Sequence, residues 1–248
     1  MRIGVFAEAR LRFDVGDPFV AVSDLHSGGA GRQNNFHQGL FLDFLDQYVR
    51  PEHLALYLLG DIVDTYETPS LRAWLRMNWI MIPALAVLDV RAVPGNHDDV
   101  LAMPDHLESE YLLAWHGHQL DPACRGRGTL GKIGGTAWGA AERLGLSVLF
   151  RPLKRIAVRW NDRRMGGIGR SGDSNAAYMA DALEWFEGGK ARSLYLCGHS
   201  HKPELVEYPD GRVFANCGSW VDTLSTGESV GWAVEVRGVD VRLLEIRP

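Results

Sequence analysis

Two histidines one residue apart, His199 and His201, follow a short apolar run in the segment SLYLCGHSHKPE, residues 193–204. Similar clusters of Asp, His and Asn follow four other apolar runs: Asp24–His26, Gly60–Asp64, Gly95–Asp98 and His116–His118. Carboxylate, imidazole and carboxamide donors without thiolates suit divalent ions such as Mn²⁺, Fe²⁺, Co²⁺, Ni²⁺ and Zn²⁺. The donors outnumber what one ion needs, which predicts a centre with two ions.

The elements that must position these clusters alternate along the first part of the chain. Short runs that are apolar on both faces predict buried strands at 19–23, 54–59, 87–93, 111–115 and 193–197. Apolar residues at three- and four-residue intervals predict helices at 34–49, 70–82 and 174–186. Ligand sites of parallel α/β sheets lie beyond the carboxyl ends of the strands, so the five clusters should converge there.

The last part of the chain has a different pattern. Strand-like runs separated by turn residues predict an antiparallel meander, with strands at 205–208, 213–217, 230–236 and 239–246. Glycines flank the polar clusters of the first part, and we expect them to permit tight turns and close backbone approach: Gly60, Gly95, Gly117 and Gly198.

The ordered series DLH, GDIVD, GNHD, HGH and GHSH, from Asp24 to His201, resembles the calcineurin-like metallophosphoesterases. The segment NCGSW that follows, residues 216–220, is similar to the usual strand-rich ending of that family. The resemblance implies an α/β fold, a layered β-sandwich flanked by helices, formed by residues 1–248 as a single domain. It also implies hydrolysis of a phosphoester or diphosphate bond.

The resemblance assigns the metal ligands residue by residue. It implies one ion held by Asp24, His26 and His201 and another held by Asn96, His116 and His199, with Asp61 bridging both. Mn²⁺ is the first expectation, and Fe, Zn, Co, Ni and Mg are alternatives, because the same ligands accept several ions.

Other polar residues of the series have roles outside the ligand set. The resemblance implies that His97 is the general acid for the leaving oxygen or stabilises the transition state, and that Asp64 orients its ring. His118 is a candidate for substrate contact, with a purely structural role as the alternative. Asp98 and Asp99 are expected to cap a turn.

A basic segment, 124–170, lies between the fourth and fifth clusters. It has eleven basic residues and two acidic ones, although the chain has a formal net charge of −5. Residues 122–172 are predicted to form a helical, lid-like insertion that attracts an anionic substrate or lipid headgroups, with Arg125 and Arg127 as candidate substrate contacts. A solvated basic face over a small satellite core is the alternative.

A narrower resemblance suggests a substrate. HGHQLD, an arginine-rich insertion and then GHSHKP are similar to the UDP-diacylglucosamine pyrophosphohydrolases, although the best-known members carry Arg where this chain has His97. This implies a lipid-linked or nucleotide-sugar diphosphate as substrate. A small-molecule phosphodiesterase, a nuclease and a non-enzymatic protein-binding scaffold are alternatives. The acidic net charge argues against nucleic acid as the main partner.

The remaining features concern the cellular setting. Three cysteines without CxxC spacing predict reduced thiols and no disulfide framework. No apolar run reaches the roughly 18–20 residues that span a bilayer, and the N-terminus lacks the apolar core of a signal peptide. We expect a cytoplasmic protein, with peripheral contact to the inner face of the membrane through the basic insertion as an option. No pattern indicates an oligomeric state.

Overall fold

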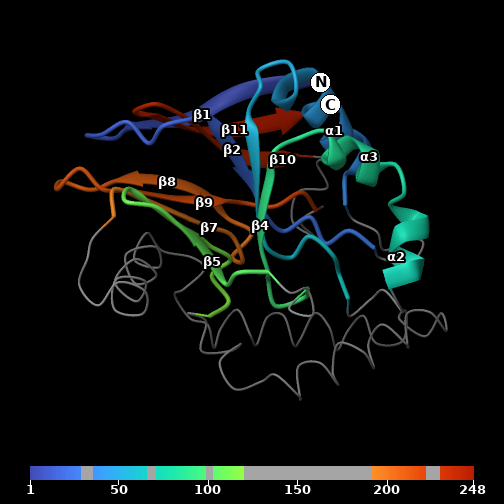
Figure 1. Cartoon of the computed structure of the whole chain (residues 1–248). Helices are drawn as coiled ribbons and strands as arrows, with labels where there is room; N and C mark the ends of the chain where they lie inside the picture. The colour runs from blue at the N-terminus through green and yellow to red at the C-terminus, as the bar shows by residue number, and fades with distance from the viewer. Residues whose placement is uncertain (29–35, 66–70, 99–102, 120–191, 222–229) are drawn as a thin grey trace, which may run out of the picture.

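The computed structural model describes residues 1–28, 36–65, 71–98, 103–119, 192–221 and 230–248, and it contains two β-sheets and few helices (Figure 1). The first sheet has the strand order β1-β11-β10-β2-β3-β4 and the second has the order β5-β6-β7-β9-β8. The six strands of the first sheet are Arg2–Arg10, Asp240–Arg247, Gly231–Arg237, Phe19–Val22, Ala55–Leu59 and Val90–Val93. Those of the second are His106–Glu108, Leu112–Trp115, Leu194–Cys197, Val213–Cys217 and Pro203–Glu207. This mixed α/β arrangement of two sheets is the predicted fold class.

Each sheet has a parallel centre and antiparallel margins. Strands β2, β3 and β4 are parallel to one another, as are β6, β7 and β9. Strands β10, β11 and β1 extend the first sheet, and β8 and β5 extend the second, by antiparallel pairing. Because parallel neighbours end at the same edge of a sheet, each sheet contributes its own set of loops to the site.

The core lies on both faces of the first sheet. In β2, Phe19 and Ala21 belong to a cluster shared with the second sheet, whereas Val20 and Val22 pack with the helices. Alternate side chains of a strand point to opposite faces, so a strand that is covered on both faces is apolar throughout. This is why the run 19–23 predicts its strand so directly.

Four helical segments are described: α1 (Gln38–Phe44), the π-helical continuation η2 (Leu45–Val49), α2 (Leu71–Met77) and α3 (Met81–Ala86). The helix predicted at 34–49 corresponds to α1 and η2. The single helix predicted at 70–82 is instead two helices separated by a turn at 78–80. Pro83 accounts for the break, because proline has no N–H to donate to the carbonyl of Trp79 and its ring clashes with that turn. The helix predicted at 174–186 lies outside the described residues.

The prediction of one antiparallel meander after His201 is wrong. Strands β8 and β9 form an antiparallel pair in the second sheet, whereas β10 and β11 form one in the first. The sequence analysis also missed β1 and β5. Strand β1 is an edge strand with a register shift between Val5 and Ala7, and most of its side chains are exposed, so its apolar alternation is weak. No helix among the described residues is long and apolar enough to cross a membrane.

Candidate metal centre

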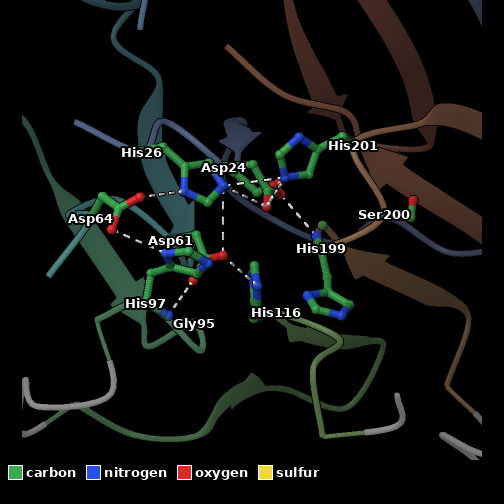
Figure 2. A network of polar contacts seen from close by, with 12 residues as sticks. Asp24, His26, Asp61, Asp64, Gly95, His97, His116, His199, Ser200 and His201 are labelled. Atoms are coloured by element: carbon green, nitrogen blue, oxygen red, sulfur yellow. Dashed lines mark hydrogen bonds and ion pairs between the residues drawn. The ribbon is translucent and has the colours of Figure 1, made fainter. Parts of the chain in front are cut away.

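The five polar clusters converge from the two sheets (Figure 2). Strands β2, β3 and β4 of the first sheet lead into the loops that carry Asp24 and His26, Asp61 and Asp64, and Asn96 and His97. Strands β6 and β7 of the second sheet lead into His116 and into His199 and His201. The predicted convergence of carboxyl ends therefore occurs, but between two packed sheets and not along one.

Asp24, His26 and His201 form the first group whose ligand atoms all lie within 4.8 Å of one another. Oδ1 of Asp24 is 3.2 Å from Nε2 of His201 and 3.7 Å from Nε2 of His26, and these two ring nitrogens are 3.2 Å apart. The other carboxylate oxygen, Oδ2, accepts hydrogen bonds from the Ser23 hydroxyl and from the backbone N–H of His199. Oδ1 is thereby directed at the two imidazoles.

Asp61, His116 and His199 form a second such group. Oδ2 of Asp61 is 3.4 Å from Nε2 of His116 and 3.7 Å from Nε2 of His26. The other oxygen of Asp61 accepts the backbone N–H of His97 at 2.8 Å. Asp61 therefore presents one oxygen to residues of both groups.

The spacing of these atoms fits a metal ion. Two ligands that are each about 2.1 Å from one ion, at angles of roughly 90–109°, lie about 3.0–3.4 Å apart. The closest separations in the first group are 3.2 Å, as noted for Asp24 with His201 and for His26 with His201. Oδ1 of Asp24 and Nε2 of His116 are also buried and make no hydrogen bond within the described part of the chain. Buried polar atoms normally have a partner, and a metal ion would satisfy both.

The ring of His116 is held in the orientation and tautomer of a metal ligand. Its Nδ1 is 2.8 Å from the carbonyl oxygen of Leu59, which can only accept, so Nδ1 carries the proton. Nε2 then faces Oδ2 of Asp61 and is the ring atom that can bind an ion once it loses its proton. Metal-binding histidines commonly hydrogen-bond through the other ring nitrogen in this way, which makes the ligating nitrogen more basic.

The charges of the centre stabilise ionised carboxylates. Burial alone would raise the pKa of Asp61, but the imidazoles of His116 and His26 outweigh it and hold that pKa far below its ordinary value. His201 and His116 act on the pKa of Asp24 in the same direction, against the effect of its burial. Burial would lower the pKa of His116, yet the carboxylates of Asp61 and Asp24 raise it to about 9.

The backbone of the centre is strained at the ligands themselves. Six non-glycine residues among those described have positive φ, and five of them are Asp24, His26, Asp61, His199 and His201. A left-handed conformation costs an L-residue about 1–2 kcal/mol. Such strain is concentrated at functional sites, where the surrounding structure enforces it.

Two glycines are required for the loops to approach each other. A Cβ on Gly95 would lie 2.1 Å from Oδ1 of Asp61, and one on Gly198 would lie 2.1 Å from Oγ of Ser23 and 2.6 Å from Oδ2 of Asp24. The expectation that the flanking glycines permit close approach is confirmed at these positions.

His97 forms a third group of this kind with His26 and Asp61, and it contacts Asp64. Nδ1 of His97 is 3.2 Å from Oδ1 of Asp64, whose other oxygen is 3.6 Å from Nδ1 of His26. Burial would raise the pKa of Asp64, but its contacts with these two imidazoles keep that pKa well below the ordinary value. Asp64 thus holds both rings, which is more than the single partner predicted for it.

The remaining predicted residues are less closely defined. Asn96 lies between Gly95 and His97, both of which contact Asp61, and its Oδ1 is buried. The ring of His118 packs near that of His116, with centroids 5.4 Å apart. Arg125, Arg127 and the insertion at 122–172 lie outside the described residues, as do Asp99 and its expected cap.

The prediction that Asp98 only caps a turn is wrong. Its buried carboxylate accepts the backbone N–H groups of Asp61, Ile62 and Val63, from the loop after β3, as well as that of Gly95. Asp98 therefore joins the two loops that carry Asp61 and His97. Its position directly after the GNH triplet was the only sequence signal.

Asn216 is a second residue that the site analysis from sequence missed. Its side-chain N–H₂ group donates to the carbonyl of Gly198 at 2.8 Å and to the hydroxyl of Ser200 at 3.0 Å, and its Oδ1 accepts the N–H of Gly218. It braces the loop that carries His199 and His201. The segment NCGSW contained the signal, but only as part of the family resemblance.

Two packed sheets with Asp and His groups at their facing strand ends are the architecture of a metal-dependent phosphoesterase. The chain belongs to the calcineurin-like phosphoesterase family, whose sequence profile matches residues 17–203. No curated protein matches the sequence at a significant level.

Several solved structures are similar to this chain in fold. A dimetal phosphatase from Danio rerio is 12% identical, with a TM-score of 0.50, and the match covers 93% of this chain and 98% of that one. A metallophosphoesterase from Sphaerobacter thermophilus is 12% identical, with a TM-score of 0.46 and coverage of 93% and 88%. Zinc-bound Vps29 from Entamoeba histolytica is 16% identical, with a TM-score of 0.44 and coverage of 92% and 91%. At these identities the likeness concerns the fold alone.

Proposed function

We propose that the protein is a hydrolase of a phosphoester or diphosphate bond that depends on two divalent metal ions. The observation that carries this proposal is the placement of Oδ2 of Asp61, which faces His116 of one ligand group at 3.4 Å and His26 of the other at 3.7 Å. A site for one ion would not need a shared carboxylate. Asp24, His26 and His201 would hold one ion, and Asn96, His116 and His199 the other.

The chain's own residues supply positioning and proton transfer. Two divalent ions at such a site neutralise charge on a phosphoryl group and make hydroxide available at neutral pH. His97 lies beside both ligand groups, and its ring is held through Nδ1 by Asp64 at 3.2 Å. Its Nε2 is therefore the atom that would give a proton to the departing oxygen. Asp98 and Asn216 keep the ligand loops in register.

The substrate class that we propose is a lipid-linked or nucleotide-sugar diphosphate. Support comes from the sequence: the eleven basic residues at 124–170 form a local excess of positive charge in an acidic chain, next to the HGHQLD segment. Basic residues would attract a diphosphate and anionic headgroups. Arg125, Arg127 and His118 are the proposed substrate contacts, and the insertion the proposed peripheral membrane contact.

The test is metal-dependent turnover of a substrate panel. The panel contains a generic phosphodiester, a nucleotide-sugar diphosphate, a lipid-linked diphosphate and single-stranded DNA, each assayed with Mn²⁺ and with a chelator. Asp61→Asn should lower both bound metal and turnover at least about 100-fold, because it removes the shared anionic ligand. Asp210→Asn, the same change at an exposed turn, is the matched control.

The outcomes separate the possibilities. Turnover of the diphosphates alone supports the full proposal, and turnover of the generic ester alone retains the chemistry but refutes the substrate class. Bound metal with no turnover of any substrate would favour a binding scaffold. One ion per chain at saturation, measured by elemental analysis, would refute the two-ion centre.

A further inference from the structure

The helices α2 and α3 and the turn between them expose a group of large apolar side chains, which we call the α2–α3 patch. Its members are Leu75, Trp79, Ile80, Ile82 and Val87, which are between 39% and 65% exposed. Ile80 and Val87, with Pro83 and Ala84, line a surface hollow of about 480 Å³. A soluble surface seldom gathers so many large apolar groups without a binding role.

The spacing of buried and exposed residues along 72–81 shows that one side of this segment faces the core and the other faces solvent. Trp74, Asn78 and Met81 lie at helical spacing and face inwards: Asn78 and Met81 are buried, and Trp74 packs against the core. Arg72, Leu75, Arg76 and Trp79 lie at the same spacing on the other face and are exposed. The exposed face of α2 thus carries Arg72, Leu75 and Arg76, and Trp79 extends it in the turn after the helix.

The charged residues within the segment 71–88 are of one sign. Residues 71–88 contain no Asp or Glu, and no described acidic side chain pairs with Arg72 or Arg76. The acidic groups beside this segment are already paired: Asp46 with Arg50 at 2.6 Å, and Asp89 with Arg91 at 3.8 Å. The patch is therefore a local basic and apolar surface on a protein of net charge −5.

We propose that the α2–α3 patch docks onto an anionic lipid surface. Exposed Trp and aliphatic side chains, beside arginines that have no acidic partner among the described residues, are the composition that partitions into the headgroup region of a bilayer. Charge complementarity favours lipid over a second copy, because a symmetric pairing of patches would bring the four arginines of two copies together. Figure 1 shows α2 at the right-hand edge of the described residues, apart from the strands of both sheets.

Docking through this patch would bring the metal centre close to the lipid. The indole N–H of Trp74 in α2 donates to the hydroxyl of Ser27 at 2.9 Å, and Ser27 directly follows His26. The backbone N–H of Asp64 also donates to the carbonyl of Ser27. The helix α2 of the docking surface thus contacts the residue that directly follows the ligand His26. The docking surface does not depend on the proposed reaction.

The test is sedimentation of the full chain with vesicles of phosphatidylglycerol and phosphatidylcholine, and with vesicles of phosphatidylcholine alone. The chain should bind the anionic vesicles. Trp79→Ser/Val87→Ser should reduce binding about tenfold or more, because it removes two large apolar contacts. Phe6→Ser/Phe13→Ser, in β1 and in the loop that follows it, is the matched control, since those residues are 63% and 55% exposed against 64% and 65% for Trp79 and Val87.

Charge variants and hydrolysis sharpen the result. Arg72→Gln/Arg76→Gln should weaken binding to anionic vesicles about fivefold per arginine, and Arg2→Gln/Arg12→Gln should not. Turnover of a soluble phosphodiester should be unchanged in Trp79→Ser/Val87→Ser, so a failure of docking is distinguishable from a failure of the proposed function.

Three results would overturn the docking proposal. The first is equal vesicle binding by Trp79→Ser/Val87→Ser and by the unaltered chain, which would place any lipid contact elsewhere, for example in residues 122–172. The second is no vesicle binding by the unaltered chain. The third is a dimer in solution that this double variant converts to a monomer, which would assign the patch to contact between copies.

Discussion

Replacing Asp98 by asparagine tests whether the bridging carboxylate is held in place by the loops around it. Oδ1 of Asp98 accepts the N–H groups of Gly95 and Asp61, and Oδ2 accepts those of Ile62 and Val63. All four donors are backbone groups in a buried position, so they cannot turn towards water or other partners. An amide in place of the carboxylate keeps the size of the side chain but not its four acceptor positions.

The expected loss follows from the geometry. In either orientation, the N–H₂ group of asparagine faces two N–H donors, so two hydrogen bonds to a charged acceptor are lost and two donors are left unsatisfied. Each such bond contributes about 1.5–3 kcal/mol, which gives a loss of about 3–6 kcal/mol. That loss is a large share of the free energy of unfolding of a typical domain, which is about 5–15 kcal/mol.

The assay is denaturant unfolding in a chelator, together with metal titration of the folded variant. Asp98→Asn should lower the free energy of unfolding by about 3 kcal/mol or more and weaken metal binding, because Asp61 loses its fixed position. Asp210→Asn is the control: Asp210 is exposed and accepts the backbone N–H of Arg212, which asparagine can also accept, and the ion pair with the Arg212 side chain that it loses is a surface pair of small effect. An unfolding free energy for Asp98→Asn within about 0.5 kcal/mol of the unaltered chain, with unchanged metal affinity, would refute the reasoning.

Three further predictions concern the same centre. Because the pKa of His116 is raised to about 9, metal binding near neutral pH must displace its proton. Calorimetry in buffers of different ionisation enthalpy should detect this proton release, and the affinity for the metal ion should fall as the pH falls. The folded-state pKa of Asp64 lies well below its ordinary value of 3.8, so its contribution to stability is fully present above 3.8 and is lost as the pH falls from there through the folded-state pKa. Acid unfolding in chelator should therefore be less steep for Asp64→Asn. Gly95→Ala should abolish metal binding, since its Cβ would lie 2.1 Å from Oδ1 of Asp61. The control is Gly39→Ala in α1, where a Cβ meets nothing within 4 Å; this variant should retain metal binding and gain about 0.5–1 kcal/mol in unfolding free energy.

The sequence predicts the ligand-bearing strands because their burial leaves a strong pattern. Strands β2, β3 and β7 lie inside the runs predicted for them, and β7 begins and ends within one residue of its run, because both faces of each are covered. The polar clusters stand out against these runs. Each cluster is a short stretch of the sequence, so its residues can be read directly. The order of the five clusters therefore indicated both the family and the side chains that face one another in the centre.

The sequence pattern did not show which sheet each of the last four strands, β8 to β11, would join. A hairpin such as β8–β9 or β10–β11 has the same local pattern in either sheet, and its sheet is chosen by a long-range neighbour. Strand β9 pairs with β7, and β10 pairs with β2, over separations of about 20 and 200 residues. Those contacts depend on which apolar faces meet in the folded chain, and alternation along one strand does not encode them.

Asp98 and Asn216 were missed for a different reason. The partners of both residues are mainly backbone N–H and C=O groups of distant loops, and every residue type except proline offers the same N–H. Candidate metal ligands can be recognised from their side-chain types. Residues that hold the loops together bind backbone groups, and no sequence pattern indicates which backbone groups these are. Positioning residues of this kind are therefore found only when the loops are seen side by side.

The left-handed conformations of five ligands link the fold to the chemistry. At about 1–2 kcal/mol each, they oppose folding by about 5–10 kcal/mol, which is comparable with the net stability of a whole domain. Bonds between the loops offset part of this, such as those from the N–H of His26 to the carbonyl of Asp61 and from the N–H of Asp24 to that of Gly60. A chain that needed only a stable sandwich could relieve the strain with glycine at these positions. That it carries Asp and His there indicates that the direction of those side chains, and so the binding of ions, is what the loops are built to achieve.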